Sequence, residues 1–345
     1  MATTGIIQDP IFMEHMRDFH HVESPQRLEV IYDMIKTDFP GHLKTIAPRP
    51  ATPEELAYIH KPDYIKRVAS TAGKEYVSLD PDTQTSPRSY EAAILAAGGL
   101  FALVDALLAG EIKNGFALTR PPGHHAEANR AMGFCLFNNV ALAAEYARHK
   151  HGLEKILIID WDLHHGNGSQ HSFWDSKNVL YFSTHQYPYY PGTGAAAEVG
   201  GPKAQGYTVN VPLSSGYQDD NFVQIFERIL MPIGRQFKPD LILVSAGFDT
   251  YYLDPLGAMQ VTPKGFARMT RRLLDLSEEV CQGRLLLTLE GGYHLEGLRL
   301  STSAVLQELL GPSALTKKEH EPDARSDLSV VQKVWSIQKN YWKRD

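Results

Sequence analysis

The chain has 345 residues, 43% hydrophobic and 21% charged, so it is long enough to bury a full core and is not a disordered or low-complexity sequence. Its 34 Lys and Arg against 40 Asp and Glu residues give a net charge of −6, which argues against nucleic-acid or anionic-membrane partners. Cys135 and Cys281 are too few for a disulfide framework, and residues 1–10 lack the features of a signal peptide. We therefore expect a cytoplasmic protein.

Short apolar runs alternate with segments of helical periodicity, which is the pattern of a parallel sheet flanked by helices. Several of the apolar runs lack polar alternation, as strands buried on both faces should. In chain order, we predict helices at Pro25–Asp38, Pro53–Tyr58 and Tyr90–Leu108, a strand at Gly115–Thr119, a helix at Asn139–Lys150, strands at Lys155–Asp160, Val179–Ser183 and Tyr207–Val211, a helix at Asp219–Gln236, a strand at Leu241–Ser245, a helix at Pro263–Val280, a strand at Arg284–Leu289 and a helix at Gly297–Leu309.

The predicted elements belong to one domain, because no internal repeat and no linker rich in Ser or Gly divides them. We place this domain at residues 1–312, and we expect residues 313–345 to form a polar segment and an amphipathic helix packed on the body. The longest apolar run, Ala92–Val104, stops at Asp105, short of the ~20 residues that cross a bilayer, and is interpreted as a buried helix. Residues 187–206 are rich in Pro, Gly and Tyr, which predicts a long loop of functional importance.

Four polar clusters follow four different predicted strands. They are Arg120-Pro-Pro-Gly-His-His125, Asp160-Trp-Asp-Leu-His-His-Gly-Asn-Gly168, Ala246-Gly-Phe-Asp249 and Glu290-Gly-Gly-Tyr-His294. Ligands of open parallel sheets bind at the carboxyl ends of the strands, so these clusters should meet in one place. Each cluster alone has a plainer reading as a turn or a helix cap, but that reading does not explain four in the same topological position.

A metal site is expected within this meeting point. Asp162 and His164 lie at positions i and i+2, and Asp249 directly follows a buried strand, so the three side chains can share one ion. Two carboxylates and one imidazole leave a coordination position open for water, as in catalytic zinc sites. Sites for two manganese ions, as in arginases, need further carboxylates where this chain has Gly166 and Tyr251, so we expect a single ion.

The adjacent imidazoles of His124 and His125 are the candidates for proton transfer. Each of them needs a partner that orients its ring. Asp160 and Asn167 are available as those partners. Tyr293 follows two glycines at a strand end and can direct its hydroxyl at a developing oxyanion.

These residues, in this order, resemble the superfamily of histone deacetylases and acetylpolyamine amidohydrolases, and most closely its class II-like bacterial amidohydrolases. The resemblance covers most of the chain. It is carried by the four clusters above together with His20-His-Val-Glu-Ser-Pro-Gln-Arg27, Gly133-Phe-Cys-Leu-Phe-Asn-Asn139 and Tyr190-Pro-Gly-Thr-Gly194. It implies an α/β fold of the arginase and deacetylase type, with a single open parallel sheet flanked by helices.

The resemblance also implies roles for individual residues. Asp162, His164 and Asp249 would bind Zn²⁺, one ion per chain. His125 would be the general base and acid, Tyr293 would supply the oxyanion hydroxyl, and His124, oriented by Asp160, would be an electrostatic partner. Class I members carry an Asp where this chain has Asn167, and an amide raises the basicity of an imidazole less than a carboxylate does, so His125 is expected to be the less basic ring.

The family also binds one or two potassium ions. By resemblance, the inner ion would lie on Asp160, Ser183 and the backbone oxygens of Asp162, His164 and Thr184. The outer ion would use backbone oxygens near Phe173, Ser176, Val179 and Tyr207.

A narrow tunnel holds the substrate's aliphatic stem in the family. Here Gly133, Phe134 and Tyr190 would form its wall and Leu256 its rim, while His20 and His21 lie in a loop at its mouth. Asp82 is a candidate acceptor for the backbone of a peptide substrate.

The sequence thus predicts a zinc-dependent amidohydrolase that removes acetyl, or a longer acyl group, from acyl-lysine proteins or small acylated amines. An acetylpolyamine deacetylase is the alternative within the same class. Leu256 stands where a polyamine-selective relative carries an acidic residue, which favours acyl-lysine. From a different class, the chain could be an acyl-ligand sensor without catalysis, but Tyr293 and every proposed metal ligand are present. Nothing in the sequence indicates the oligomeric state.

Overall fold

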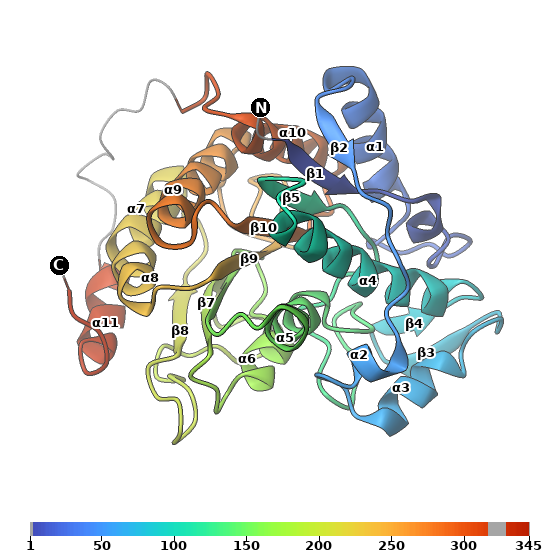
Figure 1. The fold of residues 1–345 in the computed structure, drawn as a ribbon, viewed down its shortest axis with the longest axis horizontal. Coiled ribbons are helices and arrows are strands. Elements are labelled where there is room, and N and C mark those ends of the chain that lie inside the picture. Colours follow the sequence, from blue (N-terminus) through green and yellow to red (C-terminus); the bar gives the residue numbers. More distant parts are fainter. Residues whose placement is uncertain (1–2, 317–328, 345) are drawn as a thin grey trace.

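The computed structural model describes residues 3–316 and 329–344, and its centre is one eight-stranded sheet (Figure 1). All of its strand pairings are parallel, and the strand order is β2-β1-β5-β10-β9-β6-β7-β8. The predicted parallel α/β fold is therefore confirmed. The strands are β1 Thr4–Ile7, β2 Leu43–Thr45, β5 Asn114–Ala117, β6 Ile156–Asp160, β7 Val179–Gln186, β8 Thr208–Leu213, β9 Leu241–Ala246 and β10 Leu285–Leu289.

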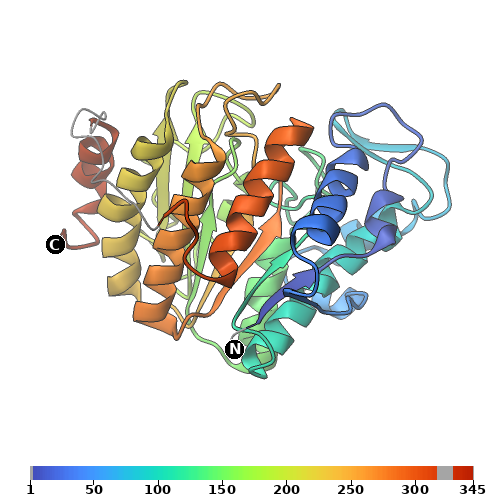
Figure 2. The same cartoon turned by 90° about the horizontal axis from the view of Figure 1, so that it is seen from above.

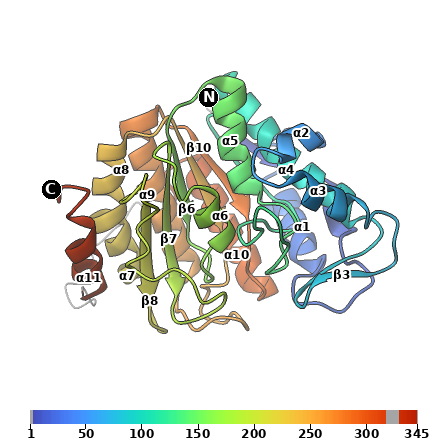
Figure 3. The same ribbon diagram turned by 90° about the horizontal axis from the view of Figure 1, so that it is seen from below.

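Helices cover both faces of the sheet (Figures 2 and 3). One face carries α1 (Gln26–Asp38), α7 (Asp219–Ile225), α8 (Met231–Phe237), α9 (Pro263–Cys281) and α10 (Leu295–Leu310). The opposite face carries α4 (Ser89–Leu108), α5 (Asn139–His151) and α6 (Asn167–Ser172), with α2 (Pro53–Leu56) and α3 (Pro62–Ala69) beside them. Strands β6, β9 and β10 are buried at every position, as expected for a sheet covered twice.

Helix α4 is the one helix of residues 3–316 and 329–344 whose length and composition would suffice to cross a membrane. It lies inside the molecule instead, since 67% of its most apolar 18-residue stretch is buried. The interpretation of Ala92–Val104 as part of a buried helix is confirmed.

The helix predicted over Asp219–Gln236 is interrupted, and the physical reason is Pro232. A π-helical turn, Phe226–Leu230, separates α7 from α8. Proline has no N–H, so Pro232 cannot donate to the carbonyl of Arg228 one turn earlier. The indole Nε1 of Trp335 donates to that carbonyl instead, at 2.6 Å. Trp335 belongs to α11 (Ser329–Gln338), so a helix is present where the C-terminal amphipathic pattern predicted one.

Several short elements have no counterpart in the sequence prediction. They are β1, β2, α3, α6, the 3-10 turn Pro10–Met13, and a small antiparallel hairpin of β3 (Val77–Asp80) and β4 (Thr83–Thr85). The predicted loop over residues 187–206 has no regular structure, as expected. Residues 317–328, which include most of the expected polar segment, lie outside the described residues. The division into a domain of residues 1–312 and a C-terminal addition stays a prediction.

Candidate active site

The strand order explains why the four polar clusters come together. Strands β5, β10, β9 and β6 are consecutive neighbours in the sheet, and each cluster directly follows one of them. Because the strands are parallel, all four clusters emerge at the same edge. The sequence placed these residues at one edge correctly, although it missed two outer strands of the sheet.

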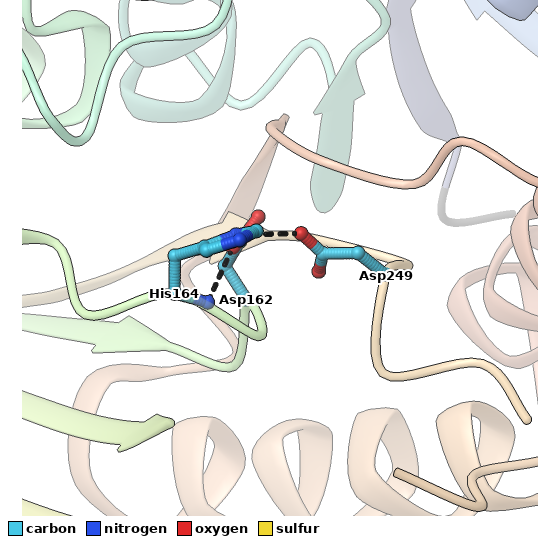
Figure 4. Close-up of side chains that lie close together, drawn as sticks. All are labelled: Asp162, His164 and Asp249. Atoms are coloured by element: carbon cyan, nitrogen blue, oxygen red, sulfur yellow. Dashed lines mark hydrogen bonds and ion pairs between the residues drawn. The ribbon is translucent and has the colours of Figure 1, made fainter. Parts of the chain in front are cut away.

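Asp162, His164 and Asp249 converge at this edge (Figure 4). The Nδ1 atom of His164 lies 3.1 Å from Asp162 Oδ1 and 3.1 Å from Asp249 Oδ2. Backbone N–H groups hold the carboxylates in place: Leu163 donates to Asp249 at 2.8 Å, and Gly291 donates to Asp162 at 2.8 Å. Each residue offers one ligand atom, and these atoms all lie within 4.8 Å of one another.

The chemistry of this triad fits a divalent cation. Both aspartates are fully buried, and burial, together with the neighbouring Asp162, raises the pKa of Asp249 to about 7. Two buried carboxylates that repel each other are stabilised when a cation lies between them. Carboxylate oxygens and imidazole nitrogens are also zinc ligands, and catalytic zinc sites have three protein ligands. Among the described residues, this is the group that could hold a metal ion.

His124 is held by a carboxylate, as expected. Its Nδ1 atom lies 3.0 Å from Asp160 Oδ2, which also accepts the Tyr181 hydroxyl at 3.0 Å. Burial alone would lower the pKa of His124, but Asp160, Asp162 and Glu290 outweigh it and raise the pKa to about 10. The His124 ring is therefore a buried cation.

His125 has the opposite environment. Its Nδ1 atom lies 2.8 Å from Asn167 Oδ1, so its direct partner is a neutral amide. Burial, followed by the proximity of His124 and His164, holds the pKa of His125 well below its usual value. The adjacent pair His124 and His125 thus combines one charged and one neutral imidazole, with ring centroids 4.0 Å apart.

Tyr293 lines a cavity together with His124 and His125, and hydrogen bonds of the backbone hold it in place. Its N–H donates to Asp254 Oδ2 at 2.7 Å, and the N–H of His294 donates to the same oxygen at 3.1 Å. The guanidinium of Arg27 lies 5.0 Å from the centroid of the Tyr293 ring. Burial raises the pKa of the Tyr293 hydroxyl well above its usual value, so this hydroxyl stays protonated and can donate a hydrogen bond.

These side chains surround a narrow cavity of about 100 Å³. Its lining residues are Asp82, Pro122, His124, His125, Gly133, Phe134, His164, Tyr190, Leu256, Gly291 and Tyr293. The structure therefore brings the expected tunnel residues together with the expected catalytic and metal-binding residues.

Gly133 has to be a glycine at this position. Its φ is +57°, and a Cβ atom there would lie 2.2 Å from Cδ2 of His125. Phe134 follows it with φ of +67°, and its N–H donates to Thr83 Oγ1 at 3.0 Å. The rings of His21 and Phe134 pack edge to face with their centroids 4.7 Å apart, so the loop at the mouth contacts the cavity wall.

Asp82 lies in the turn of the β3–β4 hairpin and lines the cavity mouth. Its Oδ1 atom already accepts two hydrogen bonds, from Gly133 N at 2.9 Å and from Thr83 Oγ1 at 2.7 Å. An acceptor role toward a peptide substrate would therefore fall to the other carboxylate oxygen.

The loop that carries Tyr190 is fastened by buried polar contacts. His165 Nδ1 lies 2.7 Å from Thr193 Oγ1, and His185 Nε2 lies 2.8 Å from the carbonyl oxygen of Gly194. Burial lowers the pKa of His185 to about 4, so its ring is neutral. Below this network, Asp160 and Ser183 are register partners on β6 and β7, so two expected ligands of the inner cation are neighbours, and Thr184 follows Ser183 on β7.

Sequence reasoning missed a buried charge network behind Tyr293. Glu23 pairs with Arg27 at 2.8 Å and with Arg120, whose Nη2 atom lies 2.6 Å from Glu23 Oε2. Arg27 Nε donates to the backbone oxygen of Gly292 at 2.7 Å, beside Tyr293. Glu23 and Arg27 stand at i and i+4 within a motif that carried the resemblance, and that spacing was the available signal.

Comparisons with known proteins agree with this geometry. The family profile described as histone deacetylase domain matches residues 21–309. Histone deacetylase 15 of Arabidopsis thaliana is 43% identical over 333 residues, which cover 93% of this chain and 59% of that protein. The polyamine deacetylase HDAC10 of Homo sapiens is 40% identical over 336 residues, which cover 93% of this chain and 50% of that protein.

A probable deacetylase of Archaeoglobus fulgidus is 38% identical over 297 residues, which cover 85% of this chain and 82% of that protein. Among solved structures, the crystal structure of the HDA15 HD domain matches with a TM-score of 0.90 and 40% identity, over 99% of this chain and 95% of that chain. The chain therefore spans only 50–59% of the length of the first two relatives, and almost all of the solved domain.

Proposed function

Because the chain belongs to the histone deacetylase family, we propose that it is a zinc-dependent hydrolase that removes acetyl, or a longer acyl group, from the ε-amine of lysine or a related amine. The observation that carries this proposal is the convergence of Asp162, His164 and Asp249 within 4.8 Å, beside the cavity lined by His125 and Tyr293. Those three residues would hold the zinc ion. When bound, the ion activates water and polarises the acyl carbonyl.

One residue of the chain transfers protons, and two others stabilise charge. Neutral His125 accepts the proton of the attacking water and returns it to the leaving amine. Cationic His124 stabilises the negative charge that develops beside it, and the protonated hydroxyl of Tyr293 donates a hydrogen bond to the oxyanion. The rings of Phe134 and Tyr190 enclose the aliphatic stem and exclude water.

Further parts of the proposal follow from the family. A potassium ion would lie on Asp160, Ser183 and the neighbouring backbone oxygens, including that of Thr184, and would stabilise the ends of β6 and β7. The net charge of −6 and the two buried free cysteines support a cytoplasmic protein that acts on acylated proteins or amines rather than on nucleic acid.

The proposed function predicts acetate release from an acetyl-lysine peptide, with a strong dependence on Tyr293. Tyr293→Phe keeps the ring but removes the donor, so kcat should fall about 10²- to 10³-fold while KM changes little. The measurement is steady-state kinetics on the zinc-loaded protein, with Tyr252→Phe as the matched control, because that tyrosine is exposed and does not line the cavity. Undiminished kcat in the Tyr293 variant would contradict the assigned role.

A polyamine deacetylase is the second candidate, since one relative carries that name. A polyamine is cationic along its length, so a site dedicated to it should offer an acidic rim. At the rim here, Asp82 already accepts two hydrogen bonds within the protein, and the half-buried Leu256 is apolar, which favours acyl-lysine over acetylspermidine. Leu256→Glu should raise kcat/KM for acetylspermidine about three- to tenfold, and Leu256→Gln should not.

Comparing both substrates on the wild type and the two Leu256 variants separates these candidates. Wild-type preference for acetylspermidine would reverse the order of the two candidates. A zinc-loaded protein that binds acyl amides but turns over none of them would favour a non-catalytic sensor.

A further inference from the structure

The orientation of the Asn167 amide is fixed by its surroundings. The two acceptors on one side of it are Glu127 Oε1, 2.6 Å from Asn167 Nδ2, and the backbone oxygen of His125, 3.2 Å away. Carboxylate and carbonyl oxygens only accept hydrogen bonds, so the Nδ2 group must face them. Asn167 Oδ1 is therefore the atom that lies 2.8 Å from His125 Nδ1, and that ring nitrogen must donate. In the neutral ring, His125 Nε2 is left free to accept a proton.

Glu127 is thus connected to His125 through one amide group. The side chain of Glu127 is 15% exposed, and its Oε1 atom also lies 2.9 Å from Nδ1 of the half-exposed His171. Its backbone is fastened as well: its N–H donates to the carbonyl of Arg130 at 2.9 Å, and its carbonyl oxygen lies 2.9 Å from Nδ1 of His60. The carboxylate is therefore held in place at the outer end of the pair formed by His125 and Asn167.

We propose that Glu127 is a positioning residue for the hydrolysis, and that it supplies through the Asn167 amide the negative charge that His125 lacks at direct contact. This inference rests on the proposed function. Hydrogen bonds in a chain polarise one another, so a carboxylate on Nδ2 makes Oδ1 a stronger acceptor. The stronger bond at Nδ1 raises the capacity of His125 Nε2 to hold a proton. His124 has its carboxylate in direct contact, whereas His125 has a carboxylate one amide away.

The same contacts explain why the direct partner of His125 is an amide. An aspartate at position 167 would place a carboxylate oxygen 2.6 Å from Glu127 Oε1 and 3.2 Å from a backbone oxygen. Two carboxylates at that distance cannot both stay ionised. Asn167 and Glu127 therefore act as one unit, and an ionised aspartate at position 167 is compatible only with a residue 127 that carries no negative charge.

Three variants test the proposal by kinetics. Glu127→Gln keeps an acceptor for Asn167 but removes the charge, so kcat should fall about three- to tenfold, a part of the ~100-fold that acid–base catalysis contributes, with KM unchanged. In the Asn167→Asp variant, kcat should fall further than in Glu127→Gln. The double variant E127Q/N167D moves the charge inward by one residue and should recover to within about twofold of the wild-type kcat. Full activity in Glu127→Gln, or a double variant no better than Asn167→Asp, overturns the proposal.

A matched control comes from a carboxylate of similar burial outside the site. Glu145 is 11% exposed and lies 3.2 Å from His149 Nε2, so it also pairs with a histidine. Glu145→Gln should leave kcat and KM unchanged. Melting temperatures of all variants show whether a loss of activity reflects a loss of fold.

A spectroscopic readout separates this proposal from the proposed function. In protein labelled with ¹⁵N-histidine, the Nδ1 proton of His125, assigned by its absence in His125→Gln, should resonate at low field and should move upfield in Glu127→Gln. It should return toward low field in the double variant. A resonance that does not move in Glu127→Gln contradicts the link even if the enzyme is active. Absence of hydrolysis by the wild type contradicts only the proposed function.

Discussion

Asp249→Asn is expected to abolish metal binding and to lower kcat/KM by at least about a thousandfold. The reason is that an amide is a poor ligand for a divalent cation, whereas Asp249 offers a carboxylate oxygen 3.1 Å from His164 Nδ1. The local fold should be kept, because the amide oxygen can still accept the N–H of Leu163. Metal content per chain, measured by atomic emission, should fall from one ion to none alongside the kinetic loss.

The stability of the metal-free protein distinguishes a lost ligand from a lost fold. Asp249 has its pKa raised from 3.8 to about 7 by burial and by Asp162, so its ionisation destabilises the metal-free fold progressively as the pH rises from about 4 to about 7. The neutral asparagine removes this destabilisation. At pH 8 the metal-free variant should therefore melt no lower than the metal-free wild type. A variant that still binds one zinc ion and turns over substrate would contradict the assignment of Asp249.

Glu23→Gln is expected to destabilise the protein by about 3–5 kcal/mol. The carboxylate pairs with two guanidinium groups, those of Arg27 and Arg120, and so offsets one of their two positive charges; all three side chains are buried. The glutamine removes the carboxylate that both buried guanidinium groups share, so the net charge of the three side chains rises from +1 to +2. Urea denaturation measures the loss, and Glu111→Gln is the matched control, since its ion pair with Lys44 is exposed and should contribute no more than about 1 kcal/mol.

The same carboxylate should determine part of the acid sensitivity. Burial would raise the pKa of Glu23, but Arg120 and Arg27 outweigh it and lower the pKa from 4.5 to about 2. The stabilisation is therefore fully present above pH ~4.5 and is lost as the pH falls toward 2, by about 3 kcal/mol in total. The wild type should lose this increment in an acid titration and the Glu23→Gln variant should not. Parallel acid profiles of the two proteins would contradict the role of Glu23.

The sequence predicts those parts of the fold that depend on burial along a continuous segment. Strands β6, β9 and β10 are apolar runs covered on both faces, and their bounds agree with the prediction to within a residue. Strand β1 has only four residues, of which Thr4 and Gly5 are not typical of an apolar run, and strand β2 has three, none of them buried. The interruption before Pro232 was missed because periodicity continues through a π-helical turn, although proline marks the position.

The metal ligands and the two imidazoles could be predicted because each follows a strand, and parallel strands bring their ends together. The supporting charges could not be predicted in this way. Glu23 lies 97 residues from Arg120 in the sequence, and Arg27 lies 265 residues from Gly292. In a sequence, such charged residues resemble surface residues, and only the folded structure shows that they are buried. Glu127 was missed for the same reason, since its partner Asn167 lies 40 residues away.

Side chains of helix α11 donate hydrogen bonds to two backbone oxygens elsewhere in the molecule, those of Arg228 and Thr208. Trp335 satisfies the carbonyl that Pro232 leaves open, and the Gln338 side chain donates to the backbone oxygen of Thr208 on β8, at 3.2 Å. Strand β8 is the outermost strand on its side, and exposed backbone groups on such a strand are a template onto which another copy can add. We therefore expect that α11, by covering part of this outermost strand, reduces edge-to-edge association between copies of the protein.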